Sequence, residues 1–372
     1  MQRKLGRNDF APRRAGLSRL AEPLRQRALR ACSVAGSPQV LRISDAVRFV
    51  WSPGSNNANS AVLIDRASAS AALTDPGTSG FLDVSRGKNL LLASIVRRER
   101  VEPRWLLLTH KHVDHVGNGV FRDRFETIYA HENAFGHLLD PGSWAEDMIR
   151  LAREGHGDFK NSSILKALSY IPGAARPSWF VWRSVVYGRG LEPFRRKEDG
   201  GLLTAYPKNR RLQLGSLDID VLETPGHCPD EVTLVVNTEG KKVLIVGDII
   251  RPQRGLRIDA VPSGYAPECD PDAFERSLAL LLEQDADVVL PAHGKPIIGR
   301  EEVLRVLDAS LRTTRAIVAE LEHLWSKHPD WRAQQIGNAA FKRLELWNNR
   351  LLCLDERTAW AASFYRQRKE RQ

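Results

Sequence analysis

Three histidines and an aspartate stand within six positions of one another in the segment Thr109-His110-Lys111-His112-Val113-Asp114-His115. The segment directly follows an apolar stretch, residues 105–108, which has the pattern of a buried strand. Neutral imidazole and carboxylate are ligand types that suit zinc, and also iron or manganese. A loop at a strand end can aim such side chains at one point above a sheet edge. The segment therefore predicts a metal site.

Three further side chains of ligand type each follow a predicted strand. They are His227 after residues 217–223, Asp248 after residues 242–246, and His293 after residues 287–290. Glycine or proline stands beside each of them and turns the backbone sharply. A single histidine after a strand is most often a surface residue, but four such matches in order are hard to reach by chance. The seven side chains exceed what one zinc ion binds, whereas two metals that share Asp248 would use them all.

In this arrangement the sequence resembles the metallo-β-lactamase superfamily, over roughly residues 47–299. Members of that family show an HxHxDH segment, then a histidine after a strand, a bridging aspartate and a late histidine. The resemblance implies an α/β (α+β) fold, a four-layer αββα sandwich with a dinuclear site at one sheet edge. The Thr-Pro-Gly-His and Gly-Asp contexts look closest to the glyoxalase II, lactonase and thioesterase-like branches.

The resemblance also implies a ligand set and a mechanism. The first metal would be held by His110, His112 and His227, and the second by Asp114, His115 and His293, with Asp248 between them. Two zinc ions are expected, with iron or manganese as alternatives, and they would lower the pKa of a bridging water enough to form hydroxide. That hydroxide would attack a carbonyl or phosphorus, while Asp114 would orient it and pass on its proton. Cys228, beside a ligand, is expected to be a small packing residue.

Short strands and helices interleave along the chain, which is the pattern of an α/β or α+β domain. Strands are predicted at residues 47–51, 61–65, 72–74, 104–109, 126–130, 211–214, 217–223, 232–237, 242–246 and 287–290. The Asn237-Thr-Glu-Gly240 turn predicts a hairpin between the strands that flank it. Helices are predicted at residues 89–98 and 271–283, and over most of residues 300–372.

Three parts of the chain are expected. Residues 1–44 form a basic, flexible extension with one short helix, residues 45–299 the metallo-β-lactamase domain, and residues 300–372 a helical extension used for packing or dimer contact. Within the domain, residues 137–208 exceed what a minimal family member needs and are predicted to be a helical insertion rich in aromatic and basic residues. Asp248 and His293 are only 45 positions apart, too few for the domain that β-CASP nucleases insert there.

The net charge of +10 is concentrated in the N-terminal extension. Residues 1–44 contain ten Lys and Arg against Asp9 and Glu22, so the remaining chain holds 45 basic and 43 acidic residues. A nearly neutral body disfavours a nucleic-acid groove. No apolar run is long enough for a membrane span or a secretory signal, and the four cysteines lie far apart, so a cytoplasmic location is expected. In a eukaryote the extension would also suit a mitochondrial or plastid transit peptide.

Metal ligands do not choose a substrate, so candidate substrate contacts come from other residues. Trp179 and Trp182 belong to the aromatic residues of the insertion, which would form either a lid that binds an acyl chain or ring, or a small core of its own. Arg251, three residues after Asp248, would hold an anionic group. Lys111, between two ligands, is a further candidate for a substrate contact.

We therefore predict a metal-dependent hydrolase that acts on a small-molecule ester, thioester or lactone. One alternative is a phosphodiesterase or ribonuclease on the same fold. Another is a non-enzymatic interaction module, which would have no chemical reason to retain seven ligand positions. The expected partner is a small-molecule substrate rather than a membrane or a nucleic acid, and a homodimer is compatible with the helical extension.

Overall fold

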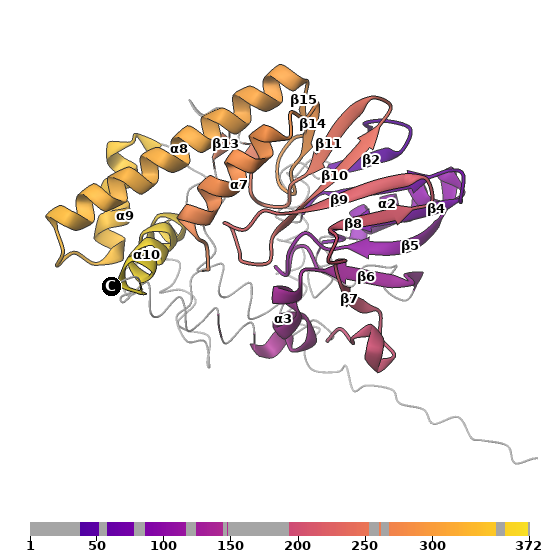
Figure 1. Ribbon diagram of the computed structural model, residues 1–372, viewed down its shortest axis with the longest axis horizontal. Coiled ribbons are helices and arrows are strands. Elements are labelled where there is room, and N and C mark those ends of the chain that lie inside the picture. The colour runs from indigo at the N-terminus through magenta and orange to yellow at the C-terminus, as the bar shows by residue number, and fades with distance from the viewer. Residues whose placement is uncertain are drawn as a thin grey trace, which may run out of the picture.

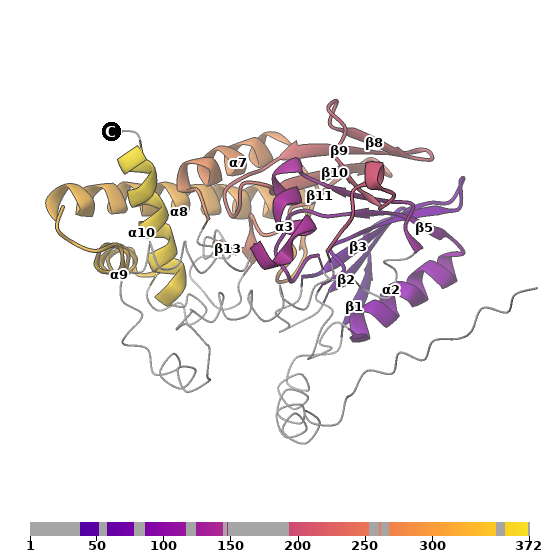
Figure 2. The ribbon, with the colours of Figure 1, turned by 90° about the horizontal axis from the view of Figure 1, so that it is seen from below.

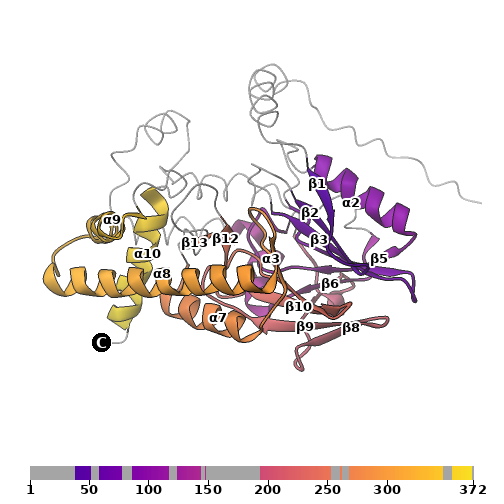
Figure 3. The same cartoon turned by 90° about the horizontal axis from the view of Figure 1, so that it is seen from above.

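Two β-sheets pack face to face, and helices cover the outer face of each (Figure 1). Helix α2 (Arg86–Glu99) lies on the first sheet, while α7 (Pro271–Glu283) and α8 (Arg300–Lys327) lie on the second (Figures 2 and 3). This arrangement is the predicted four-layer αββα sandwich. The computed structural model describes residues 38–51, 58–77, 86–116, 124–143, 147, 193–252, 260–261, 268–346 and 354–370.

The first sheet has seven strands in the order of the sequence. They are β1 (Gln39–Arg42), β2 (Val47–Trp51), β3 (Ser60–Asp65), β4 (Ser70–Thr74), β5 (Glu102–Leu107), β6 (Thr127–Ala130) and β7 (Leu203–Ala205). From β1 through β4 each strand pairs antiparallel with the next, and from β4 through β7 each strand pairs parallel with the next. The central strands β3 and β4 are buried along their whole length, as expected for strands covered on both faces.

The second sheet has six strands in the order β15-β14-β11-β10-β9-β8. They are β8 (Arg211–Leu214), β9 (Leu217–Glu223), β10 (Val232–Thr238), β11 (Lys241–Ile245), β14 (Val288–Leu290) and β15 (Ile297–Ile298). Strand β10 is antiparallel to both β9 and β11, and β14 is parallel to β11. Strands β9, β11 and β14 therefore point in one direction. A separate two-stranded pair joins β12 (Arg251–Pro252) to β13 (Ala260–Val261).

The strand directions bring the predicted ligands to one edge of the sandwich. Each ligand segment follows the carboxyl end of β5 in the first sheet, or of β9, β11 or β14 in the second. At this edge the two sheets are joined directly, because Val232 N donates a 2.9 Å hydrogen bond to Thr109 O and Asn59 N donates to Ala292 O. The ends of strands from both sheets thus lie next to one another at this edge.

Three clusters of buried apolar side chains hold the layers together. Leu63 of the first sheet and Leu234 of the second belong to the core between the sheets. In β9 every second residue, Leu217, Ile219 and Val221, is buried in that core, which is the alternation of a strand with one exposed face. A second cluster packs α2 on the first sheet, and a third packs α7 and α8 on the second.

The C-terminal helices continue the third cluster rather than forming a separate unit. Helix α8 lies beside α7 on the second sheet and extends beyond it to α9 (Ala333–Arg343) and α10 (Leu354–Glu370) (Figure 1). Trp360 of α10 packs on Phe274 of α7 with 5.5 Å between ring centroids. The predicted extension at residues 300–372 therefore shares its core with the sandwich, and α8 supplies part of the outer helical layer.

Among the described strands, β1, β7 and the two-residue strands β12, β13 and β15 lie where the sequence predicts none. Strand β1 precedes the predicted domain boundary at residue 45; it is a largely exposed edge strand, so no apolar alternation marks it. Strand β7 falls inside the predicted insertion at residues 137–208, which also contains the end of α3 (Phe135–Leu139) and the short 3₁₀ helix η4 (Lys197–Asp199). Most of that insertion and the helix expected within residues 1–44 lie outside the described residues. Among the helices of the described part, none combines the length and the apolar character that crossing a membrane requires.

Candidate metal centre

Three imidazoles meet at the end of β5. The loop after this strand carries His110 and His112, and the turn after β9 brings His227 to them. His112 Nδ1 lies 3.1 Å from His110 Nε2 and 2.8 Å from His227 Nε2, and all three side chains are buried. The three nitrogens converge as the ligands of one cation would. The point between them corresponds to the first predicted metal position.

A second group of ligand atoms lies beside the first. His293 Nε2 is 3.2 Å from Asp114 Oδ2 and 3.4 Å from Asp248 Oδ1. His115 Nε2 is 3.5 Å from the same Asp248 oxygen, whereas the other oxygen, Oδ2, is 3.5 Å from His227 Nε2 of the first group. Asp248 therefore lies between the two groups, and each of its oxygens faces one of them.

The donor atoms of the second group fit a bound cation. Within the described part of the chain, His115 Nε2, Asp248 Oδ1 and both ring nitrogens of His293 are buried and lack a well-formed hydrogen bond. A buried polar atom without a partner costs about 1–3 kcal/mol. Three of these atoms, His115 Nε2, His293 Nε2 and Asp248 Oδ1, lie together, with 3.5 and 3.4 Å from the two nitrogens to the oxygen, and a cation between them would satisfy all three. Two carboxylates and five imidazoles suit zinc, iron or manganese. The residues present therefore fit a metal centre.

The ring nitrogens that face away from the centre are held by other groups. Asp75, directly after β4, places Oδ2 3.3 Å from His115 Nδ1 and also accepts hydrogen bonds from the amide and hydroxyl of Thr109. Thr109 Oγ1 in turn lies 3.1 Å from His110 Nδ1. These contacts hold both histidines with Nε2 toward the centre, which is how outer groups orient metal ligands.

His112 is held in the opposite ring orientation, with Nδ1 rather than Nε2 toward the centre. Its Nε2 lies 2.8 Å from Glu268 Oε1, which leaves Nδ1 to face the centre. The same carboxylate binds Lys111 through Oε2, since the Lys111 ammonium lies 2.9 Å from it and 2.7 Å from Asp230 Oδ1. Although burial opposes both shifts, these ion pairs raise the pKa of Lys111 and lower that of Glu268. Lys111 thus contacts two carboxylates inside the protein, and this position does not agree with the predicted substrate contact.

The charges at the centre are unevenly distributed. Burial disfavours the ionised form of Asp248, yet the imidazoles of His293 and His115 hold its pKa well below the ordinary value. Burial likewise opposes protonation of His115, but Asp75 and Asp248 raise its pKa well above the ordinary value. Burial and the neighbouring His115 and His112 lower the pKa of His110. Asp75 and Asp248 thus place negative charge beside His115, and a bound dication would neutralise it.

Two buried polar residues hold the loops that carry His293 and Asp248. Asn59 Nδ2 donates 2.9 Å hydrogen bonds to the carbonyl oxygens of Pro291 and Gly294, which flank His293. Glu231 Oε1 accepts a 2.6 Å hydrogen bond from Asp248 N. Gly247 precedes this amide at φ +54°, where an added Cβ would lie 2.8 Å from Glu231 Oε1. Only glycine therefore leaves room for this contact.

Lys88 of α2 is fully buried beside the centre. Its ammonium donates to the carbonyl oxygens of Ala58 and Asp75, the latter at 3.1 Å. Burial lowers the pKa of Lys88 from 10.5 to about 7, against the opposing effect of Asp75 and Asp114. Asp75 itself has φ +39°, which is unfavourable for a residue other than glycine, and the hydrogen bond from Lys88 helps to hold it there.

All seven predicted ligands are therefore described and lie together, whereas Lys111 is the one predicted substrate contact whose side chain is described. Arg251 lies in β12, and nothing is described of its side chain. Trp179 and Trp182 lie outside the described residues. Sequence reasoning missed the supporting residues Asp75, Lys88, Asn59, Asp230 and Glu268. Of these, Asp75 alone follows a predicted strand directly, as the ligands do, and could have been found by that signal.

A family model described as the metallo-beta-lactamase superfamily matches residues 55–293, which include all seven ligand positions. The chain belongs to the metallo-beta-lactamase superfamily. Membership agrees with the observed sandwich and with the position of the ligand cluster at its edge. It points to a metal-dependent hydrolase, and it leaves the metal, the number of ions and the substrate open.

Two solved structures of the superfamily share the fold over most of the chain. A metallo-beta-lactamase family protein from Thermus thermophilus is 18% identical with a TM-score of 0.55, over 90% of this chain and 94% of that one. A beta-lactamase domain protein from Burkholderia ambifaria is 19% identical with a TM-score of 0.55, over 88% of this chain and 86% of that one. At such identities the likeness concerns the fold. Among curated proteins, none matches the sequence significantly.

Proposed function

We propose that this superfamily member is a dinuclear metal hydrolase that acts on a small-molecule ester, thioester or lactone. The observation that carries the proposal is Asp248, whose two oxygens face two separate groups of buried ligands, at 3.5 Å from His227 Nε2 and 3.4 Å from His293 Nε2. A shared carboxylate between two ligand groups is the arrangement that two neighbouring dications require. We propose zinc as the metal, because imidazole predominates among the ligands.

The chemistry follows from what the residues can hold. Two dications bound here would lower the pKa of a water and polarise the oxygen of a carbonyl group. Asp114, whose Oδ2 lies 3.2 Å from His293 Nε2, would orient the attacking water and accept its proton. Asp75, Thr109 and Glu268 would keep the histidines in the orientation that this requires. The mechanism uses no serine or cysteine nucleophile.

The phosphodiesterase or ribonuclease alternative depends on basic residues that could hold a nucleic acid. The run Arg195, Arg196 and Lys197 lies on the surface and makes only local contacts within the described part of the chain. Arg195 donates to Asp199 O, Arg196 pairs with Glu198 at 3.2 Å, and Lys197 donates to Thr127 Oγ1 at 2.9 Å. The nearly neutral body favours a small neutral or singly charged substrate. A cytoplasmic location accords with such a substrate and stays part of the proposal.

The test compares initial hydrolysis rates of the zinc-loaded protein on a panel of thioesters and lactones and on a bis-aryl phosphodiester. The Asp114→Ala/His115→Ala double variant gives the background, and Glu283→Gln, an exposed change on α7, is the matched control. We expect carbonyl turnover well above background in the wild type and in the control. Preferential cleavage of the phosphodiester would overturn the substrate class, and rates equal to the background on every substrate would overturn the hydrolase.

A further inference from the structure

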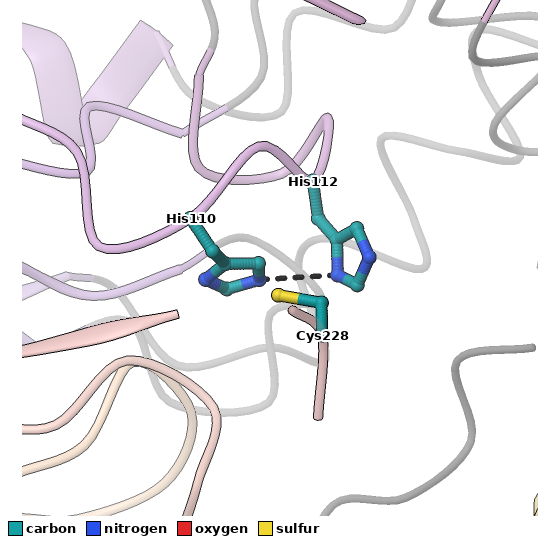
Figure 4. Close-up of side chains that lie close together, drawn as sticks. All are labelled: His110, His112 and Cys228. Carbon is teal, nitrogen blue, oxygen red and sulfur yellow. Dashed lines mark hydrogen bonds between the residues drawn. The ribbon is translucent and has the colours of Figure 1, made fainter. Parts of the chain in front are cut away.

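Cys228 is a buried thiol directed at the first group of ligands. It follows the ligand His227 in sequence and is only 1% exposed. Figure 4 shows its sulfur pointing toward the imidazole of His110, close to the dashed line that joins His110 to His112. One ligand atom from each of these three side chains lies within 4.8 Å of the other two, so one cation could reach all of them.

The turn after β9 explains why two consecutive residues face the same centre. Cys228 O accepts hydrogen bonds from Gly226 N and Glu231 N, each 3.4 Å long, which closes the turn around the ligand. Gly226 has φ +155° and packs so closely on α7 that an added Cβ would lie 2.7 Å from Phe274 Cα. The backbone of the turn is therefore fixed against α7, and Cys228 is held with His227 rather than alternating away from it.

The other neighbours of the sulfur already have their counterion. Cys228, Asp230 and Glu268 also lie within 4.8 Å of one another. The ammonium of Lys111 is bound to both of these carboxylates, at 2.7 and 2.9 Å, and fills the place that a cation would take there. The position left for a metal near the sulfur is therefore the one toward His110 and His112.

We propose that Cys228 Sγ is a ligand of the first metal together with His110, His112 and His227, an inference that rests on the proposed metal centre. When the metal binds, the Sγ–H bond breaks, an Sγ–metal bond forms and the proton leaves to solvent, so no oxidant or reductant is needed. Beside one oxygen of the shared Asp248, three imidazoles and a thiolate form a predominantly soft ligand set, which selects thiophilic ions such as zinc over manganese. The second position includes the carboxylate oxygens of Asp114 and Asp248, which are hard ligands. The two positions therefore differ in metal preference.

Cobalt substitution tests the proposal without any turnover assay. Sulfur ligation of Co²⁺ produces a near-ultraviolet charge-transfer band, whereas nitrogen and oxygen ligands alone produce only the weak visible bands. We expect the band in the cobalt-loaded wild type, its loss in Cys228→Ser, and its retention in Cys269→Ser. Cys269 is the matched control because it is an equally buried free cysteine beside Glu268 and belongs to none of the ligand groups of the described residues.

The outcomes separate this proposal from the proposed function. Visible cobalt bands in the wild type without the charge-transfer band would overturn sulfur ligation and leave the metal centre intact. Absence of any cobalt binding by the wild type would overturn both. A competition between Cd²⁺ and Mn²⁺ gives a second readout, in which Cys228→Ser should lower the preference for cadmium by roughly tenfold or more. An unchanged preference would contradict the role of the sulfur in metal selection.

Discussion

His112 Nε2 lies 2.8 Å from Glu268 Oε1, although 156 residues separate them in the chain. The contact fixes which nitrogen of His112 faces the metal centre, and it joins the loop after β5 to the segment that leads into α7. Because the same carboxylate neutralises Lys111, one residue both orients a ligand and balances a buried charge. Glu268, which is not one of the predicted ligands, thus helps to hold the metal centre in place.

Glu268→Gln should weaken binding of the first metal by roughly 10- to 100-fold. Glutamine can still accept a hydrogen bond from His112, so the loss reflects the missing charge rather than the missing contact. Chelator competition measures the affinity, with Glu283→Gln as the exposed control. Equal affinities in Glu268→Gln and the wild type would show that the carboxylate charge does not act on the metal.

Asn59→Ala should act mainly on the second metal. The change removes the side-chain hydrogen bonds to Pro291 O and Gly294 O that hold the loop of His293, and should cost about 1–3 kcal/mol of unfolding free energy. Denaturant unfolding of the metal-free protein and stepwise metal titration give the two readouts. Asn237→Ala, an exposed change on β10, is the control. An equal loss at both metal positions would contradict a specific role at His293.

Asp65 links the two sheets far from the centre and should make the fold sensitive to acid. It accepts hydrogen bonds from Ser68 N at 2.7 Å and Ser216 N at 3.2 Å. Although burial opposes the shift, hydrogen bonds from Ser216 and Ser68 lower its pKa from 3.8 to about 2. The carboxylate therefore contributes stability that is fully present above pH 4 and is lost as the pH falls toward 2.

Asp65→Asn should lower the unfolding free energy by about 2 kcal/mol at pH 7, and the difference from the wild type should shrink toward pH 2. Thermal or denaturant unfolding across this range is the measurement, and the exposed Asp218→Asn is the control. A deficit of the same size at pH 7 and pH 2 would mean that the effect is not one of charge.

Lys88 predicts that the stability of the metal-free protein also rises with pH, in a higher pH range than for Asp65. Burial lowers its pKa from 10.5 to about 7, so between these values the unfolded chain binds more protons than the folded one. Stability should therefore rise with pH over this range, by about 2–4 kcal/mol, and Lys88→Met should lack this rise. Unfolding of the chelator-treated proteins at pH 7 and pH 10 makes the comparison. Parallel pH dependence in both proteins would contradict a depressed pKa.

The fold and the cluster of seven side chains could be predicted because both depend on local patterns. The apolar run before Thr109 and the alternation of residues 217–223 mark strands, and Pro271 at the start of a helical pattern, after Asp270 as its cap, fixes the beginning of α7. His227, Asp248 and His293 each follow such a strand end. The family resemblance implied that they meet at one sheet edge, and they do so because β9, β11 and β14 point in the same direction.

The supporting residues could not be predicted in the same way, because their roles depend on contacts between distant segments. Nothing near Glu268 in sequence indicates that its carboxylate reaches His112, and nothing near Asn59 indicates that it holds the loop of His293. Lys111 illustrates the converse: its place between two ligands suggested the substrate, whereas Asp230 and Glu268 bind its ammonium inside the protein. Edge strands such as β1 escaped prediction because exposure removes the apolar signal.

Anomalous diffraction from crystals of the zinc-loaded protein shows whether two metals share Asp248. We expect two zinc peaks, one among His110, His112 and His227 and one among Asp114, His115 and His293, with an oxygen of Asp248 next to each. In Asp248→Asn crystals at least one peak should weaken strongly. A single peak in the fully loaded wild type, or two peaks with Asp248 next to neither, would rule out a metal pair that shares this carboxylate.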